Sequence, residues 1–125
     1  MKRREVVVTN AVRRYFQDFH EILAAYLYGS ILTDTFSARS DIDVLFIAKE
    51  IPYPHKFIQK LKRRRQRCRK LKLDLNVVFL DEFRRRWHIY RPPAFFVGIK
   101  MRHLHLWGRD VLREVRKNEV SDLDV

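Results

Sequence analysis

The chain has 125 residues, enough for one domain whose hydrophobic core needs neither disulfides nor a structural metal. Hydrophobic residues make up 46% of it and charged residues 34%, a composition that excludes an intrinsically disordered protein. The 27 Lys and Arg outnumber the 15 Asp and Glu, and the net charge of +12 favours an anionic partner: nucleic acid, nucleotide phosphates, an acidic protein or an anionic membrane surface.

The first half of the chain predicts one helix and two buried strands. Residues 9–20 are expected to be helical, because apolar residues recur there at helical spacing. Residues 23–28 are a compact apolar run that ends in Gly29-Ser30, which is typical of a strand entering a sharp turn. Residues 31–40 are polar and predict a turn of helix followed by a loop. Residues 42–48 are apolar and rich in β-branched side chains, so they predict a central strand covered on both faces.

The second half predicts a helix over residues 55–70 and a second apolar strand over residues 73–80. The apolar stripe of that helix is Phe57, Ile58, Leu61, Cys68 and Leu71. Later elements are a short helix over 81–90, a helix over 94–101, an edge strand over 103–107 and a last helix to about residue 118. This order predicts an α/β (α+β) fold, a small mixed β-sheet with helices packed on it, in a single domain over residues 1–125.

The expected compartment is the cytoplasm. Cys68 is the single cysteine, so no internal disulfide can form, which fits a reducing environment. No apolar run approaches the ~18 residues of a membrane span. The N-terminus is basic, as a signal peptide's is, but residues 6–8 are too few for its apolar region. We therefore expect a protein with no membrane partner.

Three aspartates occur where carboxylates are costly. Asp43 interrupts the apolar run 42–47, and Asp74 interrupts the run 71–80. A carboxylate in a buried strand destabilises the fold unless a partner compensates it. Asp41 and Asp43 are two residues apart, so on an extended strand they point to the same face. If the strand that carries Asp74 pairs alongside, three carboxylates converge on one patch of the sheet.

Divalent cations would make this cluster favourable. Mg²⁺ prefers hard oxygen ligands, and two ions ~3.5–4 Å apart can bind both the attacking and the leaving oxygen of a phosphoryl displacement. Gly29 permits close approach of the backbone, and Ser30 offers a hydroxyl and an amide to phosphates. Each feature alone has a plainer explanation: an ordinary turn, a solvated strand end, or an edge-strand acid that meets an arginine. As a set they indicate a Mg²⁺–NTP site.

The motifs also carry a family resemblance. They are Tyr28-Gly29-Ser30, the run Ser40-Asp41-Ile42-Asp43-Val44-Leu45, and Leu73-Asp74-Leu75 on a later strand. With them the chain resembles the nucleotidyltransferase superfamily that includes DNA polymerase beta, and in particular its minimal, single-domain members. The resemblance spans about residues 23–80, and Leu106-Trp107-Gly108 is similar to the strand and turn that often close this fold.

The resemblance implies a role for each site residue. Gly29 and Ser30 would contact the phosphates of ATP or another NTP. Asp41 and Asp43 would ligate both Mg²⁺ ions. Asp74 would bind the catalytic ion and position or deprotonate an acceptor hydroxyl, which attacks the α-phosphate. A nucleoside monophosphate, AMP from ATP, would be transferred and pyrophosphate released.

The resemblance also implies a partner. The chain is too short to hold a separate acceptor-binding domain, so the acceptor is expected on a partner or a second subunit of a homo-oligomer. Minimal members suggest a HEPN-type toxin, with this chain as an antitoxin that adenylylates it. One departure concerns Leu32-Thr33-Asp34, which stands where minimal members often carry Ala-Arg-Gly. A phosphate contact is lost there, Asp34 adds a negative charge, and Arg39 is the candidate replacement.

Two other functions remain open from the sequence. The chain could neutralise a partner by binding alone, with a vestigial site. It could instead bind RNA or DNA through residues 60–72, where nine of thirteen residues are basic. The plainer explanation of that tract is a solvated amphipathic helix. His103 and His105 alternate as metal ligands would, but no third ligand accompanies them. Aromatic residues that could form a core, an interface or a stacking platform are Trp87, Tyr90, Phe95 and Phe96.

Overall fold

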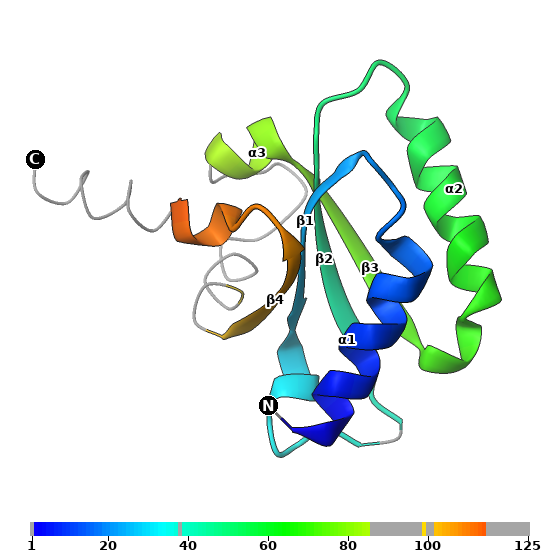
Figure 1. Cartoon of the computed structure of the whole chain (residues 1–125), viewed down its shortest axis with the longest axis vertical. Coiled ribbons are helices and arrows are strands. Elements are labelled where there is room, and N and C mark those ends of the chain that lie inside the picture. Colours follow the sequence, from blue (N-terminus) through cyan, green and yellow to red (C-terminus); the bar gives the residue numbers. More distant parts are fainter. Residues whose placement is uncertain (1, 38, 86–98, 100–101, 115–125) are drawn as a thin grey trace, which may run out of the picture.

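The computed structural model describes residues 2–37, 39–85, 99 and 102–114. Helices and strands alternate along the chain around one sheet (Figure 1). In chain order the elements are α1 (Arg3–Phe16), β1 (Ile22–Tyr28), the 3₁₀ turn η1 (Gly29–Leu32), β2 (Ile42–Ala48), α2 (Pro54–Arg67), the 3₁₀ turn η2 (Arg69–Leu71), β3 (Leu73–Phe79), α3 (Leu80–Arg85) and β4 (His103–Gly108). The predicted mixed sheet with packed helices is confirmed.

The sheet has the strand order β3-β2-β1-β4. β1 is antiparallel to both of its neighbours, whereas β2 and β3 are parallel. Parallel neighbours need a crossover connection, and α2 supplies it. β3 and β4 therefore form the two edges, as predicted for the strand over residues 103–107.

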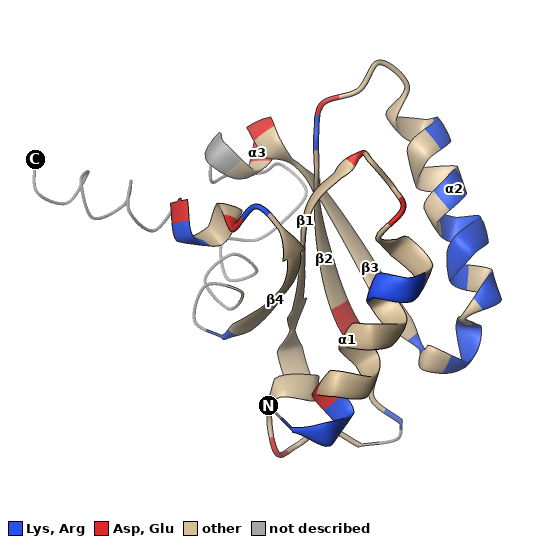
Figure 2. Cartoon of the chain, viewed as in Figure 1, with Lys and Arg blue, Asp and Glu red and all other residues tan. Residues whose placement is uncertain are grey.

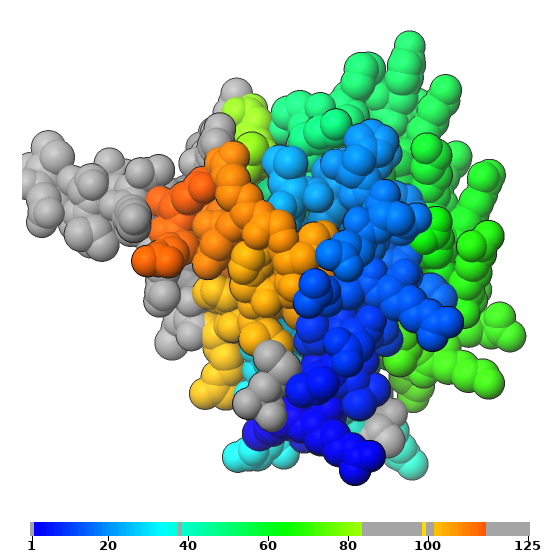
Figure 3. All heavy atoms as spheres, viewed as in Figure 1, coloured from blue at the N-terminus to red at the C-terminus, as the bar shows by residue number. Residues whose placement is uncertain are grey.

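Helices α1 and α2 lie on one face of the sheet, and their apolar stripes form the larger part of the core (Figure 1). α1 buries Val8, Val12 and Phe16 at helical spacing, because these side chains lie on one face. α2 buries Phe57 and Leu61 against the same face. Figure 3 shows α1 filling the space between β4 and α2.

A second, smaller cluster covers the opposite face of the sheet. It contains Phe83 of α3, Ile99, and Val111 and Leu112 after β4, which pack on Leu45 and other residues of the strands. β2 is therefore covered on both faces along most of its length, as its apolar sequence predicts. Within the described ranges, no helix is long and apolar enough to cross a membrane.

Three predicted helix boundaries differ from the structure by three residues or more, and one of them is the end of α1, which lies at Phe16 instead of residue 20. α1 begins six residues before the predicted start, because Glu5 accepts a hydrogen bond from the Lys2 amide (2.9 Å) and caps the first turn. α2 ends at Arg67 instead of residue 70, and Lys72 takes the left-handed conformation (φ 53°) that leads into β3. The predicted helix over 94–101, the end of the last helix and the aromatic residues 87, 90, 95 and 96 lie outside the described residues, apart from Ile99.

Tyr26 ties the segment after β4 to the sheet. Its hydroxyl donates to Asp110 Oδ1 (2.9 Å) and accepts from the Leu112 amide (3.2 Å). Burial, followed by Asp110, raises the pKa of Tyr26 far above its ordinary value. The rings of His103 and His105 flank that of Tyr26, with centroids 5.4 and 5.1 Å away. The two histidines thus pack on a core tyrosine.

Candidate active site

A row of polar side chains crosses one end of the sheet. Asp43 is the second residue of β2 and Asp74 the second residue of β3, and the parallel register pairs them directly. On the other side Asp43 is paired with Tyr28 of β1. Side chains that are opposite one another in a register lie on the same face. The sheet therefore brings the two predicted aspartates together, beside the turn that carries Gly29.

Asp41 lies one residue before the strand that carries Asp43, as the predicted strand over residues 42–48 implies. It precedes β2 and is exposed, so it lies in the entry to the strand and not on the strand itself. Its charge nevertheless acts on Asp43. The exposure of the three carboxylates is uneven, because Asp43 is half-buried whereas Asp41 and Asp74 are exposed.

The carboxyl of Asp43 is held in an unfavourable environment for a negative charge. Burial, together with the charge of Asp74, a hydrogen bond to it and the charge of Asp41, raises the pKa of Asp43 from 3.8 to about 6. Hard oxygen donors that repel one another in this way fit a divalent cation, which would offset the repulsion. In the described part of the chain, however, no three His, Cys, Asp or Glu side chains are grouped to hold a metal ion.

The backbone of Gly29 lies against this carboxyl. Gly29 has φ +79°, a conformation that other residues rarely adopt, and a Cβ added there would lie 2.2 Å from Asp43 Oδ2. Ser30 follows in a single 3₁₀ turn rather than an α-helix. A phosphate at this turn would therefore depend on the amides and hydroxyl of the turn itself, without the dipole of a long helix.

Two arginines that sequence reasoning missed hold η1 in place. The Arg4 guanidinium of α1 donates to the carbonyl oxygens of Ile31 (3.2 Å) and Thr33. Arg102, just before β4, donates to the carbonyl oxygen of Leu32 (3.4 Å). These contacts join residues 27 to 70 positions apart, so no local pattern could reveal them.

The unusual residues after η1 have partners of their own. The Thr33 hydroxyl donates to the Ser30 carbonyl oxygen (2.8 Å) and closes the turn. Asp34 forms an ion pair with Lys2 (2.8 Å), and this lysine lowers the pKa of Asp34. The Arg39 amide donates to Ser37 Oγ, but the Arg39 guanidinium forms no hydrogen bond or ion pair with the described residues.

Asn76 and Tyr28 extend the polar row. The Asn76 side-chain amide donates to the Tyr28 hydroxyl (2.7 Å) and links β3 to β1 across β2. Sequence reasoning passed over both, although Asn76 is two residues after Asp74 and so lies on the same face. On the α2 side of Asp74, a pocket of about 350 Å³ is lined by residues of α2 and β3, including Lys62 and Arg65. Arg65 donates to the Leu73 carbonyl oxygen (2.6 Å), beside the pocket.

The raised pKa of Asp43 predicts that stability falls with rising pH in EDTA. The folded-state pKa of about 6 lies above the ordinary 3.8, so the unfolded chain releases this proton first. Between these two pH values the free energy of unfolding should fall by about 1–2 kcal/mol, allowing for solvent screening. Urea titrations of wild type and Asp43→Asn at a series of pH values measure this fall, as the difference between the free energies of unfolding of the two proteins. Parallel pH profiles for the two proteins would contradict the assignment.

Comparisons with known proteins identify the family and the fold of this chain. The protein-family model described as polymerase beta, nucleotidyltransferase, matches residues 10–89 of the chain. No curated protein sequence matches significantly. Among solved structures, a chain of the tri-AMPylated Shewanella oneidensis HEPN toxin in complex with MNT antitoxin has a TM-score of 0.53 at 14% identity, over 97% of this chain and 99% of that one.

Two further solved structures are similar in fold. A chain of a mutant MntA toxin–antitoxin complex has a TM-score of 0.52 at 16% identity, over 94% of this chain and 98% of that one. A chain of a toxin–antitoxin complex with AMP-PNP has the same TM-score at 18% identity and the same coverage. At such identities the likeness concerns the fold alone. The family match, which covers more than half of the chain, shows that this protein belongs to the polymerase beta nucleotidyltransferase family.

Proposed function

We propose that this protein is a Mg²⁺-dependent nucleotidyltransferase that transfers AMP from ATP to a hydroxyl of a partner protein, and that the partner is a HEPN-type toxin. The observation that carries the proposal is the direct pairing of Asp43 with Asp74, together with the Gly29 backbone that lies against the Asp43 carboxyl. The family match supports the reaction class. One similar structure contains an AMPylated HEPN toxin, which supports the transferred group and the partner. Another contains AMP-PNP, which supports ATP as the nucleotide.

In this proposal Asp41, Asp43 and Asp74 hold two Mg²⁺ ions, and Gly29-Ser30 contacts the triphosphate. When bound, the ions neutralise charge on the phosphate oxygens and ease deprotonation of the acceptor. Asp74, the more exposed member of the pair, accepts the proton of the acceptor hydroxyl. The hydroxyl oxygen forms a bond to the α-phosphorus while the bond to the β-phosphate breaks, and pyrophosphate leaves.

The test is transfer of label in the presence of Mg²⁺ and native cell extract. Purified protein should transfer label from α-labelled ATP, but not from γ-labelled ATP, because AMP is retained and pyrophosphate is lost. The double variant Asp41→Ala/Asp43→Ala should transfer label from neither form of ATP. Protease should remove the labelled band and ribonuclease should leave it. A ribonuclease-sensitive band would make RNA the acceptor, and label from γ-labelled ATP would contradict the reaction.

A second candidate is neutralisation of the partner by binding alone. It is favoured by the position of Asp41 outside β2 and by the missing group of three carboxylates among the described residues. Neutralisation of a co-expressed HEPN partner by wild type and by Asp43→Ala separates the two functions. Equal potency of the two proteins would favour binding alone, and loss of potency in Asp43→Ala would favour the enzyme.

A further inference from the structure

Helix α2 carries a dense basic surface. No acidic residue occurs between Glu50 and Asp74, and Figure 2 shows an almost continuous row of Lys and Arg along the helix. One straight line of these cations is defined here as the α2 stripe: Lys56, Lys60, Arg63 and Arg67. The members are separated by four, three and four residues, so they lie on one face over about 16 Å of helix.

Some neighbouring cations have structural roles that explain their presence. Arg64 donates to the Tyr15 carbonyl oxygen (2.6 Å) and to both carboxylate oxygens of Asp18 (2.9 and 3.1 Å). Its guanidinium lies over the Phe19 ring, 4.9 Å from the centroid. These contacts join α2 to the turn after α1. These contacts explain the presence of Arg64 without any ligand, in line with the plainer explanation of the tract as an amphipathic helix.

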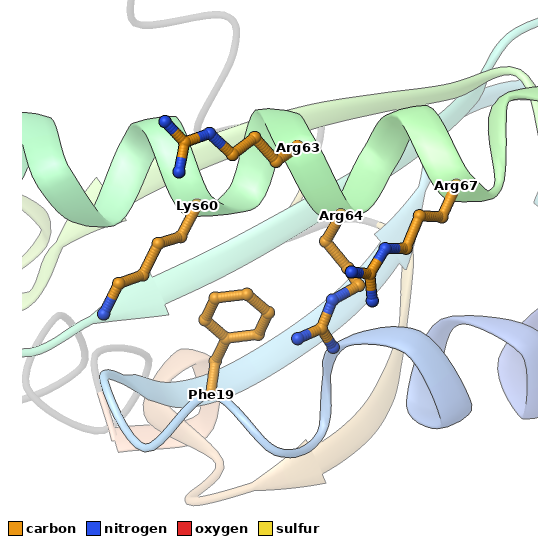
Figure 4. Close-up of a pocket in the computed structure, with 5 residues that line it drawn as sticks. All are labelled: Phe19, Lys60, Arg63, Arg64 and Arg67. Carbon is orange, nitrogen blue, oxygen red and sulfur yellow. The ribbon is translucent and has the colours of Figure 1, made fainter.

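The stripe has no such explanation. Lys60, Arg63 and Arg67 are exposed and have no hydrogen bond or ion pair with the described residues. With Arg64 and Phe19 they line a pocket of about 190 Å³ (Figure 4). In Figure 4, Arg64 and Arg67 lie side by side, and Lys60 lies on the other side of Phe19. Like charges four residues apart destabilise a helix, and no acidic side chain among the described residues offsets this repulsion for Lys60, Arg63 or Arg67.

An exposed aromatic ring stands at the start of the stripe. Tyr53, the residue before α2, is 61% exposed, and the Lys56 ammonium lies 4.9 Å from its ring centroid. The basic tract over residues 60–72 contains no aromatic residue, and Tyr53 precedes it by seven residues. A basic line beside an exposed aromatic is the arrangement that binds single-stranded nucleic acid, with phosphates on the cations and a base on the ring.

An acidic protein fits this surface less well. The centre of a protein interface is apolar, whereas the exposed residues around the stripe, such as Gln59 and Gln66, are polar. Guanidinium groups match phosphate oxygens in bidentate geometry. We propose that the α2 stripe and Tyr53 bind the sugar-phosphate backbone and a base of single-stranded nucleic acid, independently of the nucleotidyltransferase site.

The test is fluorescence anisotropy of labelled single-stranded RNA and DNA oligonucleotides, in EDTA and without NTP. Lys60→Gln/Arg63→Gln/Arg67→Gln should weaken binding by ~10-fold or more and lower the slope of log K against log salt by about 2. The matched control, Arg3→Gln/Lys49→Gln/Arg113→Gln, loses the same charge elsewhere and should change affinity less than ~2-fold. Equal losses in both variants would overturn the proposal, since binding would then follow net charge alone.

Two further arms address the ligand. Tyr53→Ala should weaken binding by ~10-fold while Tyr53→Phe retains it, because stacking needs only the ring. No effect of Tyr53→Ala would overturn the proposed base contact. Polyglutamate that competes as well as RNA at equal charge would identify an acidic-protein surface and overturn the proposal. The oligonucleotide that binds more tightly, RNA or DNA, identifies which of the two nucleic acids this surface prefers. Asp43→Asn should bind as wild type does, whether or not transfer activity exists.

Discussion

Asp43→Asn is expected to abolish nucleotidyl transfer, with a fall of ~10³-fold or more, while the fold remains at least as stable as wild type. Asparagine keeps the shape of the side chain but removes the charge that would hold a cation. It also removes the repulsion between Asp43 and its neighbours Asp74 and Asp41, which the raised pKa of Asp43 reflects. Transfer from α-labelled ATP and urea unfolding at neutral pH measure the two effects.

The matched control is Asp34→Asn. Asp34 is also an aspartate near η1, but its side chain is 98% exposed and paired with Lys2. A fully exposed ion pair contributes little to stability, so this variant should unfold at the same urea concentration as wild type and keep its activity within ~2-fold. Comparable losses in the two variants would place Asp34 in the site. Unchanged transfer by Asp43→Asn would contradict the proposed role of Asp43.

Gly29→Ala is expected to have the second largest effect, a loss of about 1–3 kcal/mol of stability and at least ~10²-fold of transfer activity. Two causes act together. The left-handed φ of +79° strains any residue with a Cβ, and the new methyl would meet Asp43 Oδ2 at 2.2 Å. Either the turn or the carboxyl must move, and both belong to the proposed site.

A double-mutant cycle separates these two causes. In the Asp43→Ala background the collision is removed and only the backbone strain of Gly29→Ala remains, about 1 kcal/mol. Gly108→Ala is an informative comparison, because a Cβ there would meet the backbone oxygen of Leu23 at 2.1 Å instead of a side chain. Its cost should therefore be unaffected by Asp43→Ala. Equal costs of Gly29→Ala in both backgrounds would contradict the close contact with Asp43.

The apolar strands were the part of the fold that could be predicted well from sequence. β2 agrees with the predicted 42–48 at both ends, since it is buried on both faces and its boundaries coincide with a change from apolar to polar residues. The start of α1 was missed because residues 6–8 are β-branched valines, which have low helix propensity. Val6 and Val7 are 41% and 56% exposed, so their helical state follows from the capping and packing of the rest of α1.

The candidate site was predictable in its residue types and less so in its arrangement. The alternation of Asp43 and Asp74 with apolar residues identified two acids on neighbouring strands, and the parallel register pairs them. Asp41 lies just before β2, in agreement with the predicted start of that strand at residue 42. The clamps on η1 by Arg4 and Arg102 depend on tertiary packing between distant segments, and no spacing in the sequence encodes them.

The place of β3 at the sheet edge bears on the size of acceptor that the proposed enzyme could use. Asp74 is exposed on this outermost strand, while Asp43 lies one strand further in and is half-buried. A reactant can meet Asp74 at this edge strand, where Asp74 also lines a pocket with residues of α2, including Lys62 and Arg65. A hydroxyl carried by a folded macromolecule would therefore have to reach only the outermost strand of the sheet, and not the half-buried position of Asp43.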